Sequence, residues 1–397
     1  MAGGGSSSSS SSPPVPLLFN EDNPLRVALV GLGRMGDMRL EELARRPDSR
    51  LAAIVDVNHE LGSKRGKKHS VPVFETLTAV LRDPKVEFDA VWICVPTPFH
   101  MEVILVALEN KKHVAVEKPV CSNAEDIRIC YETAEQHGVH LFCSFQRRFD
   151  PSYQKVASLV RSGELGERMV TIHTVFRDYP CPSIEFMKQG GCPFHDLAVH
   201  DIDFIRSILD EDPVEIYATG QSVTKELESL NIHDTASITM RYKSGLVAFL
   251  EFSRLSAYGY DQRCEVFGSN GNCARVDYPR QTSYTLATTA GHIEDVGSVS
   301  PIERFRTAYA NEVASFLATC NGTKSENKVS RKDAMLATML AEAARQSCHY
   351  KRSIFLTYYD DDVIHFSFTR GSDPSGVGQR GAPTNGLTHS LLTSSKL

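Results

Sequence analysis

The stretch Val27-Ala28-Leu29-Val30-Gly31-Leu32-Gly33-Arg34-Met35-Gly36 decides the fold of the N-terminal part of the chain. Its four apolar residues have the pattern of a short buried strand, and three glycines follow at the spacing G-x-G-x-x-G. Gly31 permits a tight turn out of the strand, Gly33 lets a backbone approach a pyrophosphate, and Gly36 lets the next helix pack closely on the sheet. The stretch therefore predicts a dinucleotide-binding turn whose cofactor contacts are Gly31, Leu32, Gly33, Arg34, Met35 and Gly36.

Asp56 supports this interpretation and selects between two cofactors. A helical pattern over residues 37–45 is followed by an apolar run that ends in Asp56, 20 residues after Gly36. A carboxylate at this position accepts hydrogen bonds from the ribose of NAD and repels the 2′-phosphate of NADP. We therefore expect NAD as the cofactor, with NADP less favoured. A glycine turn with a purely structural role is the alternative.

The composition excludes several classes of protein. The chain has 397 residues, of which 41% are hydrophobic and 23% charged, as is typical of globular proteins of two or three domains. A net charge of −6 argues against a nucleic-acid partner, and no apolar run is long enough to span a membrane. Its ten cysteines form no C-x-x-C pair, which favours reduced thiols and a cytoplasmic location. An organelle is the alternative, because the N-terminus is rich in serine and lacks acids, as transit peptides do.

The periodicity of the sequence predicts an α/β plus α+β architecture in four segments. Residues 1–24, which include a serine run, are expected to be a disordered tail. Residues 25–146 alternate buried strands with helices, which predicts a doubly wound parallel sheet of the Rossmann type. Residues 147–355 contain longer strands separated by short turns, which predicts a largely antiparallel sheet with helices on one face. Residues 356–397 are expected to be a mostly flexible C-terminal extension.

Two strand ends of the predicted parallel sheet carry polar residues that are expected to line the ligand crevice. One apolar strand runs into a proline-rich turn and then His100, and the next ends in Glu117-Lys118. A partly desolvated Lys118 close to the nicotinamide would have a lowered pKa and could exchange a proton with a substrate hydroxyl. The alternatives are an ordinary turn and a surface lysine. The predicted cofactor contacts here are Val95, Pro96, Thr97, His100, Glu117 and Lys118.

A third stretch, residues 190–203, contains the candidate general base. Asp196 and His200 are four residues apart and would share one face of a helix, with Asp203 near that face. An aspartate beside a histidine orients the imidazole and favours its protonated form. One alternative is a helix with a polar solvent side. Another is a metal site made of Cys192, His195 and His200, although this spacing matches no common zinc site.

Taken together, these motifs resemble those of the Gfo/Idh/MocA oxidoreductases, over residues 25–347. The resemblance rests on the glycine turn, Pro96-Thr97-Pro98 with His100, Glu117-Lys118-Pro119, and Gly190-Gly191 followed by Asp196 and His200. Two further segments are similar to the family, namely Gln146-Arg147 at the domain junction and Arg177-Asp178, which is closest to the inositol 2-dehydrogenase branch. Tyr179 and the residues between Gly191 and Asp196 depart from the family pattern.

The resemblance implies a reaction and roles for individual residues. It implies hydride transfer between a secondary hydroxyl of a cyclic polyol or sugar and the nicotinamide, without a metal. The implied catalytic residues are Lys118, Asp196 and His200, which with Arg177 and Asp178 also bind the substrate, while Gln146 and Arg147 contact the cofactor. Members of the family usually form homodimers or homotetramers through the open face of the C-terminal sheet, and the resemblance implies the same for this chain. The alternatives are an NADP-linked reductase of dihydrodiol or other carbonyl substrates, and a non-catalytic dinucleotide-binding regulatory protein.

Overall fold

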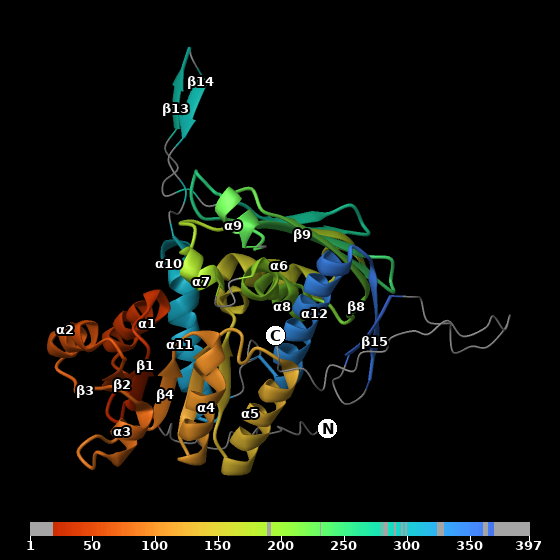
Figure 1. The fold of residues 1–397 in the computed structure, drawn as a ribbon. Coiled ribbons are helices and arrows are strands. Elements are labelled where there is room, and N and C mark those ends of the chain that lie inside the picture. Colours follow the sequence, from red (N-terminus) through yellow and green to blue (C-terminus); the bar gives the residue numbers. More distant parts are fainter. Residues whose placement is uncertain are drawn as a thin grey trace, which may run out of the picture.

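A six-stranded parallel sheet forms the N-terminal part of the computed structural model, in the order β3-β2-β1-β4-β5-β6 (Figure 1). Its strands are β1 (Leu25–Val30), β2 (Ser49–Val55), β3 (Val73–Phe74), β4 (Ala90–Ile93), β5 (His113–Glu117) and β6 (Leu141–Ser144). The helices between them are α1 (Arg34–Arg45), α2 (His59–His69), α3 (Leu77–Arg82), α4 (His100–Glu109) and α5 (Ala124–His137), with the 3₁₀ turn η1 (Thr97–Phe99) before α4. The predicted doubly wound sheet is confirmed.

The structure describes residues 19–188, 192–230, 232–278, 280, 285–289, 291–294, 297, 300–323, 329–359 and 364–368. The expectations for residues 1–18 and 371–397, and for Gly190 and Gly191, lie outside these residues. Within the segment expected to be a tail, Phe19 is buried, and its backbone exchanges two hydrogen bonds with the Asn321 side chain, of 2.7 and 2.9 Å.

The strand order locates the ligand crevice of the parallel sheet. The chain runs outward from β1 to β2 and β3, and then returns to β4 on the other side of β1. The helices that follow β1 and β4 therefore leave the sheet in opposite directions, and a crevice opens at the carboxyl ends of these two strands. Every residue of β4 is buried, as expected for a strand covered on both faces.

An eight-stranded sheet forms the C-terminal part, in the order β12-β11-β7-β10-β9-β8-β15-β16. Its strands are β7 (Met169–Arg177), β8 (Pro213–Gln221), β9 (Thr235–Tyr242), β10 (Val247–Ser253), β11 (Asp261–Gly268), β12 (Cys273–Val276), β15 (Ile354–Tyr358) and β16 (Ile364–Ser367). Among the pairs recorded for the described strands, β7 with β10 is parallel and the others are antiparallel. The strand β16 lies within the segment that was expected to be a flexible extension.

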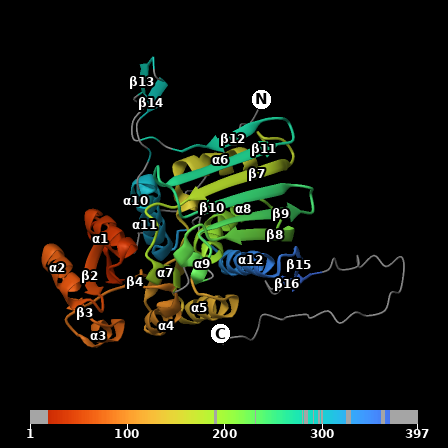
Figure 2. The ribbon, with the colours of Figure 1, turned by 45° about the horizontal axis from the view of Figure 1, so that its top comes forward.

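One face of this second sheet is covered by helices and the other is open. Figure 2 shows α6 (Pro151–Arg161) and α8 (Val199–Ile208) behind the sheet. Residues alternate between buried and exposed along β9 and β10, as they do in a sheet with one face on the core. On the open face, Tyr217, Thr239, Phe249 and His173 lie side by side across four neighbouring strands. The predicted antiparallel sheet with helices on one face is confirmed.

Two late helices connect the two sheets. A break at Phe305 separates α10 (Pro301–Arg304) from α11 (Arg306–Cys320). Helix α11 contacts α1, whereas α12 (Arg331–Tyr350) contacts both α5 and β8.

The remaining elements are η2 (Gln146–Phe149), α7 (Ile184–Lys188), η3 (Phe194–Ala198), α9 (Lys225–Ser229) and the separate hairpin of β13 (Thr285–Thr288) and β14 (Gly291–Glu294). None of the helices in the described ranges is long and apolar enough to cross a bilayer.

Candidate active site

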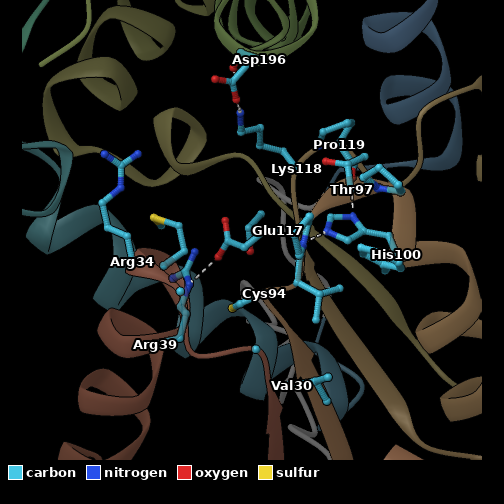
Figure 3. A pocket seen from close by; sticks show the side chains of 18 of the residues that line it. Val30, Arg34, Arg39, Cys94, Thr97, His100, Glu117, Lys118, Pro119 and Asp196 are labelled. Atoms are coloured by element: carbon cyan, nitrogen blue, oxygen red, sulfur yellow. Dashed lines mark hydrogen bonds and ion pairs between the residues drawn. The ribbon is translucent and has the colours of Figure 1, made fainter. Parts of the chain in front are cut away.

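A cleft of about 1110 Å³ lies at the carboxyl edge of the parallel sheet and reaches the second part of the chain (Figure 3). It brings together most of the residues that the sequence assigns to the site. Those that line it are Gly31, Leu32, Gly33, Arg34, Met35, Asp56, Val95, Pro96, Thr97, His100, Glu117, Lys118, Gln146, Asp178, Asp196 and His200. The second part also contributes Phe176, Phe186 and Tyr260.

The glycine turn has the geometry of a phosphate cradle. Gly31 has a φ of 94°, and a Cβ there would lie 2.8 Å from the backbone of Cys94. A Cβ on Gly36 would lie 1.9 Å from the Gly31 carbonyl oxygen, so this glycine permits helix packing and does not itself line the cleft. Gly33 is the N-cap residue of α1 and provides no side-chain cap, and the space beside its Cα is open. The uncapped N–H groups are therefore available to an anion, and the cradle fits the pyrophosphate of a dinucleotide.

Asp56 lies where the ribose of that dinucleotide is expected. The residue follows β2 directly, and its side chain borders the cleft. Its Oδ2 accepts a hydrogen bond of 2.6 Å from the Leu32 N–H, and its Oδ1 accepts one of 2.7 Å from the Asn58 N–H. The carboxylate is thus fixed beside the glycine turn, which fits NAD better than a cofactor with a 2′-phosphate.

His100 joins the two loops that follow β4 and β5. Its Nε2 lies 2.9 Å from the carbonyl oxygen of Val95, and its Nδ1 lies 2.9 Å from the carbonyl oxygen of Pro119. Burial lowers the pKa of His100, although the hydrogen bonds to these carbonyls oppose this shift. The side chain therefore acts as a buried link that holds the Lys118 loop against the neighbouring strand end.

Lys118 forms a charged cluster with Asp196 and Arg254. The Lys118 Nζ donates to the Oδ1 and to the backbone carbonyl of Asp196, both at 2.7 Å. The Arg254 guanidinium donates to Asp196 Oδ2 and to Asp178 Oδ2, again at 2.7 Å each. Burial alone would raise the pKa of Asp196, but the charges of Lys118 and Arg254 lower it well below its usual value. Asp196 is therefore a fixed, ionised group.

A wide helical turn places Asp196 for these contacts. The residue lies in η3, a π-helical turn that leads directly into α8. Such turns are rare and occur most often at functional sites. Asp196 and His200 both line the cleft, and the charge of Asp196 acts on the His200 imidazole, although no hydrogen bond joins the two side chains among those recorded for the described residues.

His200 has surroundings that differ from the predicted ones. The sequence predicts that Asp196 orients the imidazole and favours its protonated form, but Lys118 and Arg254 occupy both carboxylate oxygens. The His200 Nδ1 is buried without a hydrogen-bond partner among the described residues, and the ring packs against Phe145 and Phe176. Burial, together with the nearby charge of Lys118, lowers the pKa of His200 well below its usual value. The imidazole is therefore neutral, as a proton acceptor must be.

Arg147 and Arg177 do not reach the cleft, contrary to the roles that the resemblance implies. Arg147 is buried in an ion pair with Asp201, and its Nε donates to Gln262 at 3.1 Å. Arg177 forms an ion pair with Glu251 on the open sheet face. Arg147 is held by α8 and β11, and Arg177 is held by β10; neither residue is among those that line the cleft.

The other acidic and histidine residues of the third stretch also have structural partners. Asp203 forms a buried pair with Arg148 at 2.7 Å, which directs it away from the cleft. His195 Nε2 lies 3.1 Å from the Glu342 carboxylate, so one member of the alternative metal set of Cys192, His195 and His200 already has a partner. Among the described residues, no group of three or more His, Cys, Asp or Glu side chains is arranged to hold a metal ion.

Arg254 is the main site residue that the sequence does not predict. It follows β10, and its side chain is fully buried in the structure. Its two partners are 76 and 58 residues away along the chain, so no local spacing connects the three. The only signal in the sequence is a strong cation directly after an alternating strand.

The comparisons with known proteins identify the family of the chain. Residues 25–145 match the family model described as an oxidoreductase family with an NAD-binding Rossmann fold, and residues 153–274 match that of the GFO/IDH/MocA C-terminal domain. The myo-inositol 2-dehydrogenase of Thermotoga maritima is 33% identical over 84% of this chain and 98% of its own length. The scyllo-inositol 2-dehydrogenase (NAD(+)) of Bacillus subtilis is 31% identical over 74% of this chain and 86% of its own.

A solved structure has a similar fold. The crystal structure of scyllo-inositol dehydrogenase from Lactobacillus casei, with bound NAD(H) and scyllo-inositol, has a TM-score of 0.77 and 26% identity. The match spans 84% of this chain and 99% of the chain in the crystal structure. The family models, relatives and shared architecture show that the chain belongs to the Gfo/Idh/MocA family of oxidoreductases, as its motifs predict.

Proposed function

We propose that the protein is an NAD-dependent dehydrogenase that transfers hydride between a secondary hydroxyl of an inositol-like cyclic polyol and the nicotinamide. The observation that carries this proposal is the arrangement of Lys118, Asp196 and a neutral His200 in the same cleft as the glycine turn. The inositol dehydrogenases among the relatives support the choice of substrate class.

In this proposal, each of the three residues has a separate role. NAD, when bound at the glycine turn and Asp56, supplies the acceptor for the hydride. His200 accepts the hydroxyl proton, for which its neutral state is suited. Lys118 uses two of its three N–H donors on Asp196 and directs the third toward the reacting oxygen.

Asp196 and Arg254 then act by holding Lys118 in place. A lysine side chain has considerable rotamer freedom, and two acceptors on one residue remove much of it. Arg254 fixes the carboxylate from its other oxygen. Positioning of this kind contributes strongly to catalysis because the reacting groups no longer have to find one another.

A substrate panel tests the proposal. The purified protein is mixed with NAD or NADP and with a series of inositols, sugars and dihydrodiols, and reduced nicotinamide is followed by its absorbance. We expect turnover with an inositol or a related cyclic polyol and NAD. Activity confined to NADPH and carbonyl substrates would support the reductase alternative instead. The absence of turnover, with NAD still binding, would support a regulatory protein. The Lys118→Ala protein is the control for contaminating activity.

We also propose that two or four copies associate in the cytoplasm through the open face of the second sheet. Tyr217 and Phe249 are large apolar side chains exposed on this face, and the His173 ring stacks on the Phe249 ring with 4.8 Å between the ring centroids. An exposed apolar patch on a sheet is typical of a protein interface. Light scattering would show a dimer or tetramer, and Phe249→Glu should shift the mass toward the monomer. We further propose that residues 25–146 form the cofactor domain and that residues 147–355 form the substrate domain.

A further inference from the structure

A second charged cluster lies under the cleft, at the junction of α1, β5 and α11. The Arg39 Nε donates to Glu117 Oε1 at 2.8 Å, and its Nη2 donates to Glu312 Oε2. The guanidinium also lies over the ring of Trp92, with its Cζ 4.6 Å from the ring centroid. The side chains of Arg39 and Glu312 are completely buried. Figure 3 shows Glu117 between Arg39 and Lys118 in the lining of the cleft.

The charges of this cluster do not balance. One guanidinium faces two carboxyl groups, and the Glu312 Oε1 is buried without a hydrogen-bond partner among the described residues. An uncompensated buried carboxylate is costly, so the proton is retained more strongly. Burial raises the pKa of Glu312 to about 7, although the charge of Arg39 opposes the shift. The cluster is therefore neutral in acid and carries one negative charge in mild alkali.

The strand order places this cluster at the nicotinamide end of the cleft. Asp56 after β2 and the glycine turn after β1 occupy the adenosine and pyrophosphate positions, so the nicotinamide must lie toward β4 and β5. Glu117 is the last residue of β5, next to Lys118, and both Glu117 and Glu312 line the cleft. The nicotinamide ring is positively charged when oxidised and neutral when reduced.

From this placement we infer that Glu312 is a specificity-determining residue that makes the site prefer the oxidised cofactor to the reduced one. When Glu312 is ionised, the cluster carries one net negative charge below the nicotinamide ring. This charge attracts the positive ring of the oxidised cofactor but has no such attraction for the neutral ring of the reduced cofactor. The inference rests on the proposed use of NAD. It adds to that proposal a residue from α11, outside the cofactor-binding sheet, that selects the oxidation state.

Few other groups near Glu312 can change charge in the same pH range. Those that face it or its two partners are Arg39, Glu117, Tyr309, Cys94, Cys143 and His100. Burial lowers the pKa of His100, so this imidazole loses its charge at a lower pH than Glu312. Burial raises the pKa of Tyr309 and of both cysteines, so these three groups stay neutral. Arg39 stays protonated, because the charges of Glu117 and Glu312 outweigh the effect of burial and raise its pKa.

Calorimetric binding of NAD⁺ and NADH to the wild-type protein and to Glu312→Gln tests the inference. At pH 8 we expect the ratio of the NAD⁺ dissociation constant to the NADH dissociation constant to rise roughly tenfold in the variant, the effect of one unit charge at partly screened range. At pH 5.5 the two proteins should have the same ratio, because Glu312 is then protonated. At pH 7, titrations in buffers of different ionisation enthalpy should show that the wild type releases more protons with NAD⁺ than with NADH.

The outcomes separate this inference from the proposed function. Glu132→Gln, which removes a carboxylate on the surface of α5, should leave the ratio unchanged. If Glu312→Gln only lowers the melting temperature and keeps the wild-type ratio at pH 8, the cluster is a structural tether and the inference is wrong. If the variant does not fold, equal proton release by the wild type with the two cofactors is sufficient to overturn it. Failure of the wild type to bind either cofactor would overturn the proposed function as well.

Discussion

The two charged clusters beside the cleft use similar residues but have opposite properties. Around Arg254, two cations (Lys118 and Arg254) face two carboxylates (Asp178 and Asp196), so the formal charges cancel. Around Arg39, one cation faces Glu117 and Glu312. The pKa of Asp196 is lowered in the first cluster, whereas that of Glu312 is raised in the second.

This difference shows that burial alone does not decide the charge of a carboxyl group. Burial raises the pKa in both clusters, and the number of nearby cations decides whether that effect is overcome. Asp196 has two cations within hydrogen-bond distance and remains ionised. Glu312 shares one cation with Glu117 and retains its proton up to about neutral pH. The first cluster is therefore suited to fixed positioning, and the second to a change of charge.

The largest effect is expected from His200→Ala, which removes the proposed base and leaves the charges of the Arg254 cluster unchanged. Turnover should fall by about 10²–10⁴-fold, the usual range for loss of a general base. The dissociation constant for NAD should stay near that of the wild type. Steady-state kinetics and calorimetry measure the two quantities. Turnover within a fewfold of the wild type would show that another group accepts the proton.

Arg254→Ala should destabilise the protein strongly, because it leaves Asp178 and Asp196 buried without their shared cation. We expect a loss of about 3–5 kcal/mol in the free energy of unfolding, measured in urea. Arg177→Ala is the matched control, since Arg177 forms a partly exposed pair with Glu251 and should cost under about 1 kcal/mol. Equal losses for the two variants would contradict the proposed role of the balanced cluster.

The pH dependence of stability should have opposite signs for Glu312 and Asp196. The folded-state pKa of Glu312, about 7, lies above its ordinary value of 4.5, so the folded state binds more protons and stability falls as the pH rises between these values. The loss attributable to Glu312 should be about 3 kcal/mol and absent from Glu312→Gln. Asp196 has a lowered pKa, so its contribution is present above pH 4 and disappears in acid. Urea unfolding at pH 5 and pH 8 compares the two proteins, and parallel pH profiles would contradict this prediction.

The smallest effect is expected outside both clusters, at Asp56. Asp56→Ser removes the carboxylate that repels a 2′-phosphate, and the preference for NAD over NADP should narrow by roughly tenfold. The ratio of kcat/KM for the two cofactors measures this change. A wild-type enzyme equally efficient with NAD and NADP would contradict the prediction, and Arg34 in the glycine turn would then be the residue to test.

The sequence by itself determined the features that depend on local spacing. The glycine turn, the acid after the second strand and the alternation of apolar runs with helices predict a Rossmann sheet and its ligand edge, because each follows from contacts among residues close in the chain. The same reasoning placed Lys118 at a strand end that borders the cleft. The antiparallel second sheet was likewise predicted from the short turns between its strands.

Only the tertiary structure decided which charged groups meet. Arg254 reaches Asp178 and Asp196, and Arg39 reaches Glu312 across 273 residues, and no periodicity predicts such pairs. Because of such long-range pairs, the Asp196 carboxylate contacts Lys118 instead of orienting His200, and Arg147 is held away from the cleft by its pair with Asp201. Because the state of a buried charge depends on the cations around it, the protonation of Asp196, His200 and Glu312 could be assigned only after the fold had brought those cations together.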